Sequence, residues 1–219
     1  MQTRVIFLEQ MNRLRHDILI MSSRVEEDIA KALTALKTDD TELAQEVKAN
    51  DSVVNAMQIT IEDEAAILIA TQQPVARDLR ELVTILKITA NLERIGDHAV
   101  HLARAAIKLS GEAPFRSFGH IEKMAETGRL MLNSAITAYL NQDPAAAREA
   151  AAMDIFIDAE HKALIEEVLS LMIEHPELIK KAIRLINTSS RLERLGDHIT
   201  NICEGVIYMV ESKHEELNE

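Results

Sequence analysis

The residues best suited to chemistry are pairs of carboxylates four positions apart, set in a charged block that the sequence carries twice. The block Asn91–Val100, NLERIGDHAV, returns one hundred positions later as Arg191–Thr200, RLERLGDHIT. The acidic pairs are Glu93 with Asp97 and Glu193 with Asp197. Residues four apart in a helix lie within about 40° of one another. Each block therefore places two negative charges on one helix face, where they repel each other unless a cation lies between them.

A second set of polar pairs with the same spacing precedes each block. These pairs are Asp51 with Asn55 and, one hundred and three positions on, Asp154 with Asp158. Where the two helices of a copy run antiparallel, one pair can face the other and three or four oxygen ligands meet. Oxygen ligands favour hard or borderline cations such as magnesium, manganese and iron. The predicted metal-binding residues are Asp51, Asn55, Glu93 and Asp97 in the first copy and Asp154, Asp158, Glu193 and Asp197 in the second.

The same acids also allow a purely structural interpretation. Arg94 and Arg194 adjoin them, so the carboxylates can form salt bridges or lie on a solvated face. The second copy is the stronger candidate because it offers four carboxylates, whereas Asn55 supplies only a neutral oxygen. Gly96 and Gly196 stand mid-helix, where glycine costs about 1 kcal/mol relative to alanine. Their recurrence indicates close approach of a backbone or ligand, or tight helix packing.

The elements that carry these pairs are all predicted to be helices. Apolar residues recur at spacings of three and four, and Gly and Pro stand mainly at breaks. The predicted helices span about 5–36, 42–71, 74–109, 121–140, 144–173 and 176–213. The sequence thus predicts an all-α fold of two tandem antiparallel three-helix bundles related by an internal repeat. The units are expected at residues 1–111 and 112–219, joined by a linker at Gly111–Gly119.

Composition narrows the classes of function. The chain has 219 residues, a net charge of −12 and only 3% aromatic residues, which argues against nucleic-acid binding. The single cysteine, Cys203, excludes an intrachain disulfide and fits the cytoplasm. We expect no signal peptide and no transmembrane segment. Neither a glycine-rich phosphate loop nor a nucleophile elbow occurs, so a non-enzymatic role is favoured.

The duplicated LERxGDH block, together with QQPVARDLREL at Gln72–Leu82, resembles the PhoU family of phosphate-transport regulatory proteins. The resemblance covers nearly the whole chain. It implies two similar three-helix bundles and clusters of iron or zinc held by E(D)xxxD motifs, which here are the eight residues named above. It also implies a cytoplasmic negative regulator of phosphate uptake and of the phosphate-starvation response. Its partners would be the ATPase of the phosphate ABC transporter and a sensor histidine kinase. A homodimer is expected, with membrane contact only through partners.

Three other interpretations stay open at the level of sequence. One is an accessory protein of a low-affinity phosphate permease. Another is a carboxylate-bridged metal enzyme, although the Glu-x-x-His motif of ferritin-like sites is missing. The third is a structural bundle whose acids form salt bridges. Metal-dependent turnover, or unchanged stability on addition of metal, distinguishes the last two from a metal-binding adaptor.

Overall fold

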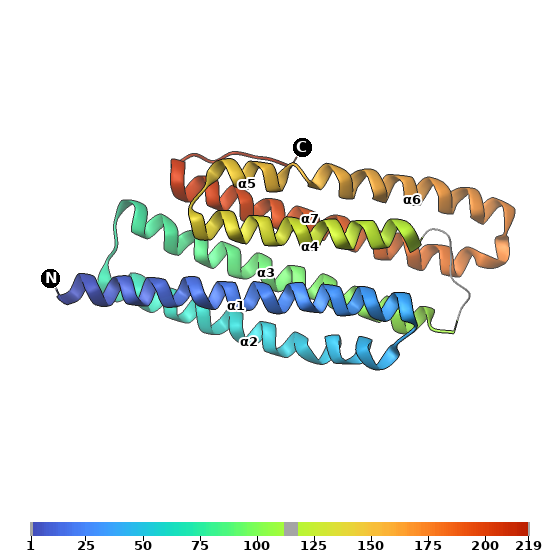
Figure 1. Ribbon diagram of the computed structural model, residues 1–219, viewed down its shortest axis with the longest axis horizontal. Coiled ribbons are helices and arrows are strands. Elements are labelled where there is room, and N and C mark those ends of the chain that lie inside the picture. The colour runs from blue at the N-terminus through green and yellow to red at the C-terminus, as the bar shows by residue number, and fades with distance from the viewer. Residues whose placement is uncertain (1, 112–117, 219) are drawn as a thin grey trace.

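The computed structural model describes residues 2–111 and 118–218, which fold into long helices without a strand in those ranges (Figure 1). The helices are α1 (Gln2–Thr38), α2 (Thr41–Gln72), α3 (Ala76–Leu109), α4 (Phe118–Asn141), α5 (Pro144–Ala151), α6 (Asp154–Glu174) and α7 (Ile179–Glu211), with a short 3₁₀ turn at Pro176–Leu178. The all-α prediction is confirmed. The predicted linker lies largely outside the described residues, so the boundary at 111/112 stays a prediction.

The expected fifth helix is divided in two. The α-helix stops at Ala151, the amide of Met153 bonds the carbonyl of Ala150 at 3.2 Å, and α6 begins at Asp154. No glycine or proline stands at this break, so hydrophobic periodicity gave no signal for it. The break makes Asp154 the first residue of a helix instead of a mid-helix residue.

Two helix bundles lie side by side along their length (Figure 1). Helices α1, α2 and α3 pack on one another, and α4, α5 and α6 pack against α7. Contacts between α3 and α7 and between α1 and α4 join the bundles. The duplicated blocks lie on α3 and α7, so the helices that carry them form much of the junction between the two copies.

The spacing of apolar residues explains which helix faces are buried. On α1, Ile18, Met21, Val25 and Ile29 recur every three or four residues, and all are fully buried. Capping residues fix two of the helix starts. The Asp40 carboxylate accepts from the amide of Leu43 at 2.9 Å at the start of α2, and Asp143 caps α5.

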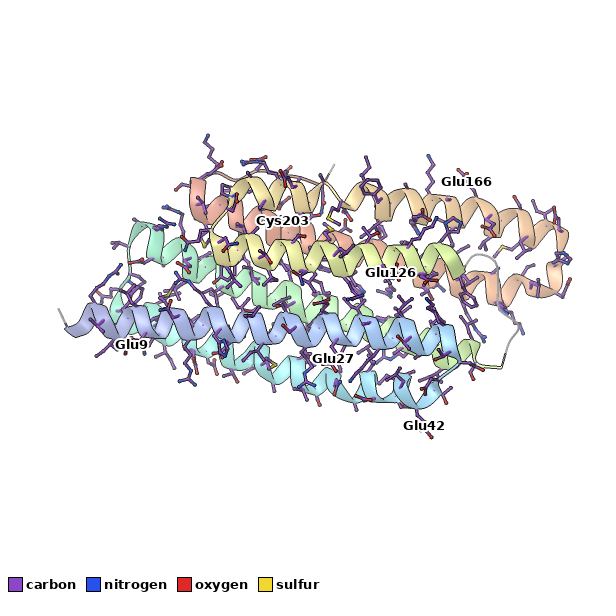
Figure 2. The ribbon with its side chains drawn as sticks, in the orientation of Figure 1. Glu9, Glu27, Glu42, Glu126, Glu166 and Cys203 are labelled. Carbon is purple, nitrogen blue, oxygen red and sulfur yellow. The ribbon has the colours of Figure 1, made fainter. Side chains whose placement is uncertain are left out.

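Charged side chains cover the outside, and glutamates such as Glu9, Glu27 and Glu42 project from the helices (Figure 2). Cys203 is a buried free cysteine, and burial raises the pKa of its thiol to about 12. A thiol of this kind is unreactive at neutral pH. Within the described ranges, none of the helices is long and apolar enough to cross a membrane.

Candidate metal-binding clusters

The second copy brings its four predicted acids together. Asp154 and Asp158 lie on the first turns of α6, and Glu193 and Asp197 lie in the middle of α7, against which α6 packs. Burial, followed by repulsion from Asp158 and Asp197, raises the pKa of Asp154 to about 7. The pKa values of Glu193 and Asp197 are also raised, first by burial and then by neighbouring carboxylates. Burial and mutual repulsion therefore disfavour the ionised forms of Asp154, Glu193 and Asp197.

Asp154 is the most buried of these acids, with 9% of its surface exposed. Its Oδ2 lies 3.5 Å from the Thr200 hydroxyl, which donates to it, and its Oδ1 has no hydrogen-bond partner among the described residues. Oδ1 faces the backbone of Gly196, where the Cβ of any other residue would overlap it. The close approach predicted at Gly196 is thus an approach by a carboxylate of the neighbouring helix.

The first copy is related but not equivalent. Burial, followed by repulsion from Asp97, raises the pKa of Glu93. Repulsion from Asp51 adds a smaller rise. Arg94 lies 3.4 Å from Glu93 and donates to Asp97 at 3.2 Å, so these two acids have a cationic partner. Asn55 is half-buried on α2, with no hydrogen bond to either acid in the described structure. This cluster is therefore smaller and partly neutralised.

The salt-bridge interpretation holds for part of the first copy only. In the described residues no ion pair involves Asp154, Asp158, Glu193 or Asp197. Three arginines in neighbouring segments form hydrogen bonds outside these clusters. Arg77 bonds Gln142, Arg80 bonds the carbonyl of Met209, and Arg184 bonds the carbonyl of Lys108.

Two further residues belong to the clusters and were not predicted. His161 on α6 lies close enough to Glu193 to oppose the rise of its pKa, and its Nδ1 lies 2.9 Å from the Ser189 hydroxyl. His161 stands three residues after Asp158 and seven after Asp154. Its place on the same helix face as these acids was therefore visible in the sequence. Glu62 repels Glu93 in the first copy. Gln58, the counterpart of His161, donates to Glu62 at 2.9 Å.

The donors fit a hard or borderline cation in kind and charge, most clearly in the second copy. Side chains of Asp154, Asp158, Glu193 and Asp197 are the ones that would hold it there. As the side chains stand, no group of three His, Cys, Asp or Glu residues converges with metal-ligand geometry in the described part of the chain. Binding therefore requires rotation of these side chains, of which Asp158 is exposed and free to move.

The block histidines point away from the acids. His98 and His198 face each other across the α3–α7 junction, with ring centroids 5.5 Å apart. The Nδ1 of His198 donates to the Asn91 side chain at 2.9 Å, and burial lowers the pKa of His98 to about 3. In each block the acids thus face a helix of their own bundle, and the histidine faces the other copy.

Comparison with known proteins places both copies in one family. The family model described as the PhoU domain matches residues 18–106 and again residues 121–206. A phosphate-specific transport system accessory protein PhoU homolog from Clostridium acetobutylicum is 34% identical over 99% of this chain and 100% of that protein. One from Pseudomonas putida is 37% identical over 93% of this chain and 80% of the relative.

Solved structures agree with the sequence comparison. The crystal structure of PhoU from Pseudomonas aeruginosa matches with a TM-score of 0.90 and 35% identity, covering 94% of this chain and all of that one. The phosphate transport system regulatory protein PhoU from Streptococcus pneumoniae also gives a TM-score of 0.90, at 29% identity over 96% of this chain and 99% of that one. With the motif, the doubled family match and the fold in agreement, the chain belongs to the PhoU family.

Proposed function

We propose that this protein is an accessory regulator of phosphate-specific transport that restrains phosphate uptake and the phosphate-starvation response when phosphate is plentiful. The observation that carries the proposal is the match of both copies to PhoU relatives whose names describe accessory proteins of that transport system. The role is that of a cytoplasmic adaptor without catalytic activity. Its partners are the ATPase of the phosphate ABC transporter and the sensor histidine kinase of the response, and it works as a homodimer.

The experiment for this role is a deletion strain of the source bacterium carrying a reporter of the phosphate-starvation response. We expect the reporter to be active in excess phosphate without the protein and to be silenced when the gene is restored. Affinity purification of the tagged protein should recover the transporter ATPase and the kinase. A silent reporter in the deletion strain contradicts the proposal, and recovery of a low-affinity permease instead would assign the protein to that transporter.

We further propose that a metal ion clamps α6 to α7 in the second copy, and more weakly α2 to α3 in the first. Support comes from the four clustered carboxylates, which form no ion pair among the described residues, and from the unpaired Oδ1 of Asp154. The metal is iron, zinc, manganese or magnesium. When bound, it would neutralise the mutual repulsion of the acids and stiffen the helix pair that partner proteins contact.

Elemental analysis tests the metal site directly. Protein purified without chelator or affinity metal should contain metal that is lost in Glu193→Ala/Asp197→Ala. The matched control is Glu122→Ala/Glu126→Ala, which removes two acids at the same spacing from α4, away from the cluster. We expect the control to keep the wild-type metal content. Equal loss in both variants, or no metal in the wild type after reconstitution, contradicts the metal site but leaves the regulator role standing.

A further inference from the structure

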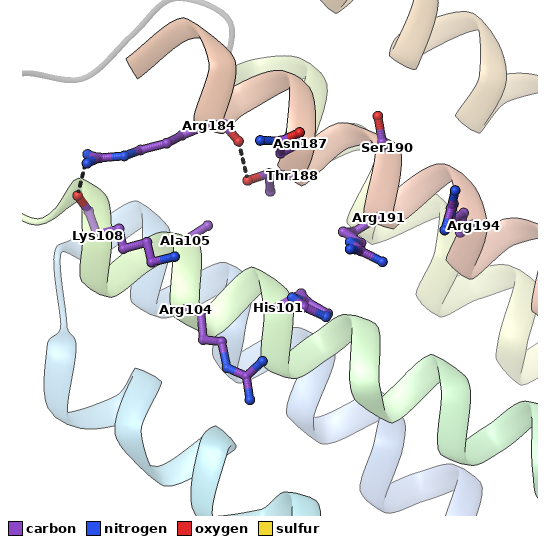
Figure 3. Close-up of a pocket in the computed structure, with 10 residues that line it drawn as sticks. All are labelled: His101, Arg104, Ala105, Lys108, Arg184, Asn187, Thr188, Ser190, Arg191 and Arg194. Carbon is purple, nitrogen blue, oxygen red and sulfur yellow. Dashed lines mark hydrogen bonds between the residues drawn. The ribbon is translucent and has the colours of Figure 1, made fainter. Parts of the chain in front are cut away.

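A cavity of about 600 Å³ opens between α3 and α7, at the junction of the two copies (Figure 3). Its walls carry basic side chains from both helices, and no acidic residue lines it. The basic residues are His101, Arg104 and Lys108 on α3 and Arg184, Arg191 and Arg194 on α7. In a chain with a net charge of −12, such a concentration of positive charge is not explained by composition.

We propose that this cavity binds an anion that carries several phosphate groups in a row. The first argument is charge. No described carboxylate forms an ion pair with Arg104, Lys108 or Arg191, although the protein has far more acids than bases. Helix packing therefore holds these cations close together without compensation from the described protein. Arginine is suited to phosphate because its planar guanidinium can donate two hydrogen bonds to one group.

Mutual repulsion of the cations is visible in the neighbouring histidine. The pKa of His101 is lowered by burial first and then by the charges of Arg191 and Arg104, with a smaller effect of Lys108. Asp97 is the acid that acts on His101 in the opposite direction. The positive groups thus act on one another across the cavity from both helices. An anion between the two walls would relieve this repulsion.

The spread of the cations sets the size of the ligand. Residues 101 to 108 cover about 10 Å along α3, and residues 184 to 194 cover about 15 Å along α7. A single phosphate ion can contact only part of such a row. Asn187 and Ser190 add neutral hydrogen-bonding groups on the α7 wall. The volume is within the usual range of about 300–1,000 Å³ for small-molecule sites, so a chain of a few phosphates fits.

The lining also indicates what the ligand lacks. No Phe, Tyr or Trp lines the cavity, and the one aromatic ring among its lining residues is the small, half-buried imidazole of His101, a poorer platform for a nucleobase than the larger rings. An inorganic oligophosphate therefore suits this cavity better than a nucleotide with the same number of phosphates. This inference does not rest on the proposed regulatory function or on the metal site, since the cavity residues are distinct from the clustered acids.

Isothermal titration calorimetry with inorganic phosphate, pyrophosphate, tripolyphosphate and ATP at about 150 mM salt tests the proposal. We expect affinity to increase from phosphate to tripolyphosphate, and ATP to bind no more tightly than tripolyphosphate. Arg104→Gln/Lys108→Gln should weaken tripolyphosphate binding at least about tenfold, because two charge-assisted contacts are lost. Both side chains are exposed, so the fold should tolerate the change.

The control is Lys162→Gln/Lys213→Gln, which removes the same net charge from exposed positions outside the cavity. It should keep the wild-type affinity for tripolyphosphate. A second variant on the opposite wall, Arg191→Gln, should weaken binding as well. Absence of tripolyphosphate binding, or equal weakening in the control, overturns the site. Equal affinity for phosphate and tripolyphosphate overturns the multi-phosphate ligand, and tighter binding of ATP overturns the preference for an inorganic chain.

Discussion

Alanine at Gly196 is expected to destabilise the protein by about 1–3 kcal/mol, whereas alanine at Gly96 should change stability by less than about 1 kcal/mol. The new Cβ at 196 would overlap Oδ1 of Asp154 and lie 3.1 Å from its Cγ and 3.2 Å from Cδ1 of Ile157. At 96 the nearest atom is Cγ1 of Val54 at 3.4 Å, an ordinary contact. There the better helix propensity of alanine opposes any packing cost.

Urea denaturation of both variants, with chelator present, measures this difference. For a chain of this length each kcal/mol lowers the melting temperature by roughly 2–4 °C, so thermal scans provide a second measurement. The double variant Gly196→Ala/Asp154→Ala should recover part of the lost stability, because the overlapping carboxylate is removed. Equal destabilisation at 96 and 196 would contradict the argument, since the two glycines occupy the same place in the repeat.

This asymmetry between the copies shows what the sequence could not predict. Gly96 and Gly196 are equivalent in the repeated block, and both were predicted to mark either a close approach or tight helix packing. The difference arises because Asp154 begins a helix, where its carboxylate turns toward Gly196. That helix start depends on a break after Ala151 without a glycine or proline. Local packing, and not a residue preference, sets the break.

The acidic pairs were predictable because their geometry is local. Helical periodicity alone places Glu193 and Asp197 on one face, and the repeat indicates which helix faces them. His161 could have been added from the same stripe of α6. The basic cavity was not predictable, because its walls come from helices about eighty residues apart in the chain. Whether Arg104 and Arg191 share a cavity depends on how α3 packs on α7.

A second large effect is expected from the ionisation of Asp154. Its pKa is about 7 in the folded protein, against an ordinary value of 3.8. Between these two values the folded state holds a proton that the unfolded chain has released. Asp154 therefore makes folding less favourable as pH rises from about 4 to 7, by about 1.4 kcal/mol for each unit. Its favourable contribution is complete below this window and lost above it.

Comparison of the wild type with Asp154→Asn isolates this contribution from others of opposite sign. The depressed pKa of His98, for example, makes folding more favourable as pH rises from about 3 to 6.5. With chelator present, we expect the asparagine variant to gain stability relative to the wild type between pH 5 and pH 8. Glu126→Gln, an exposed change of the same charge, should show no such gain. A constant difference between Asp154→Asn and the wild type across this range would disprove the buried ionisation.

Metal bound at the proposed site would reverse the sign of this effect, so measurements with and without metal test whether Asp154 is a ligand as well as a buried acid. A cation binds the ionised carboxylates, so the stability gained on adding manganese or zinc should increase with pH in the wild type. At one hundred times the dissociation constant the gain is about 2.7 kcal/mol. Asp154→Asn should lose most of it, because a neutral amide replaces a ligand. A metal-induced gain that is equal in the variant would leave Asp154 as a buried acid that titrates but binds no metal.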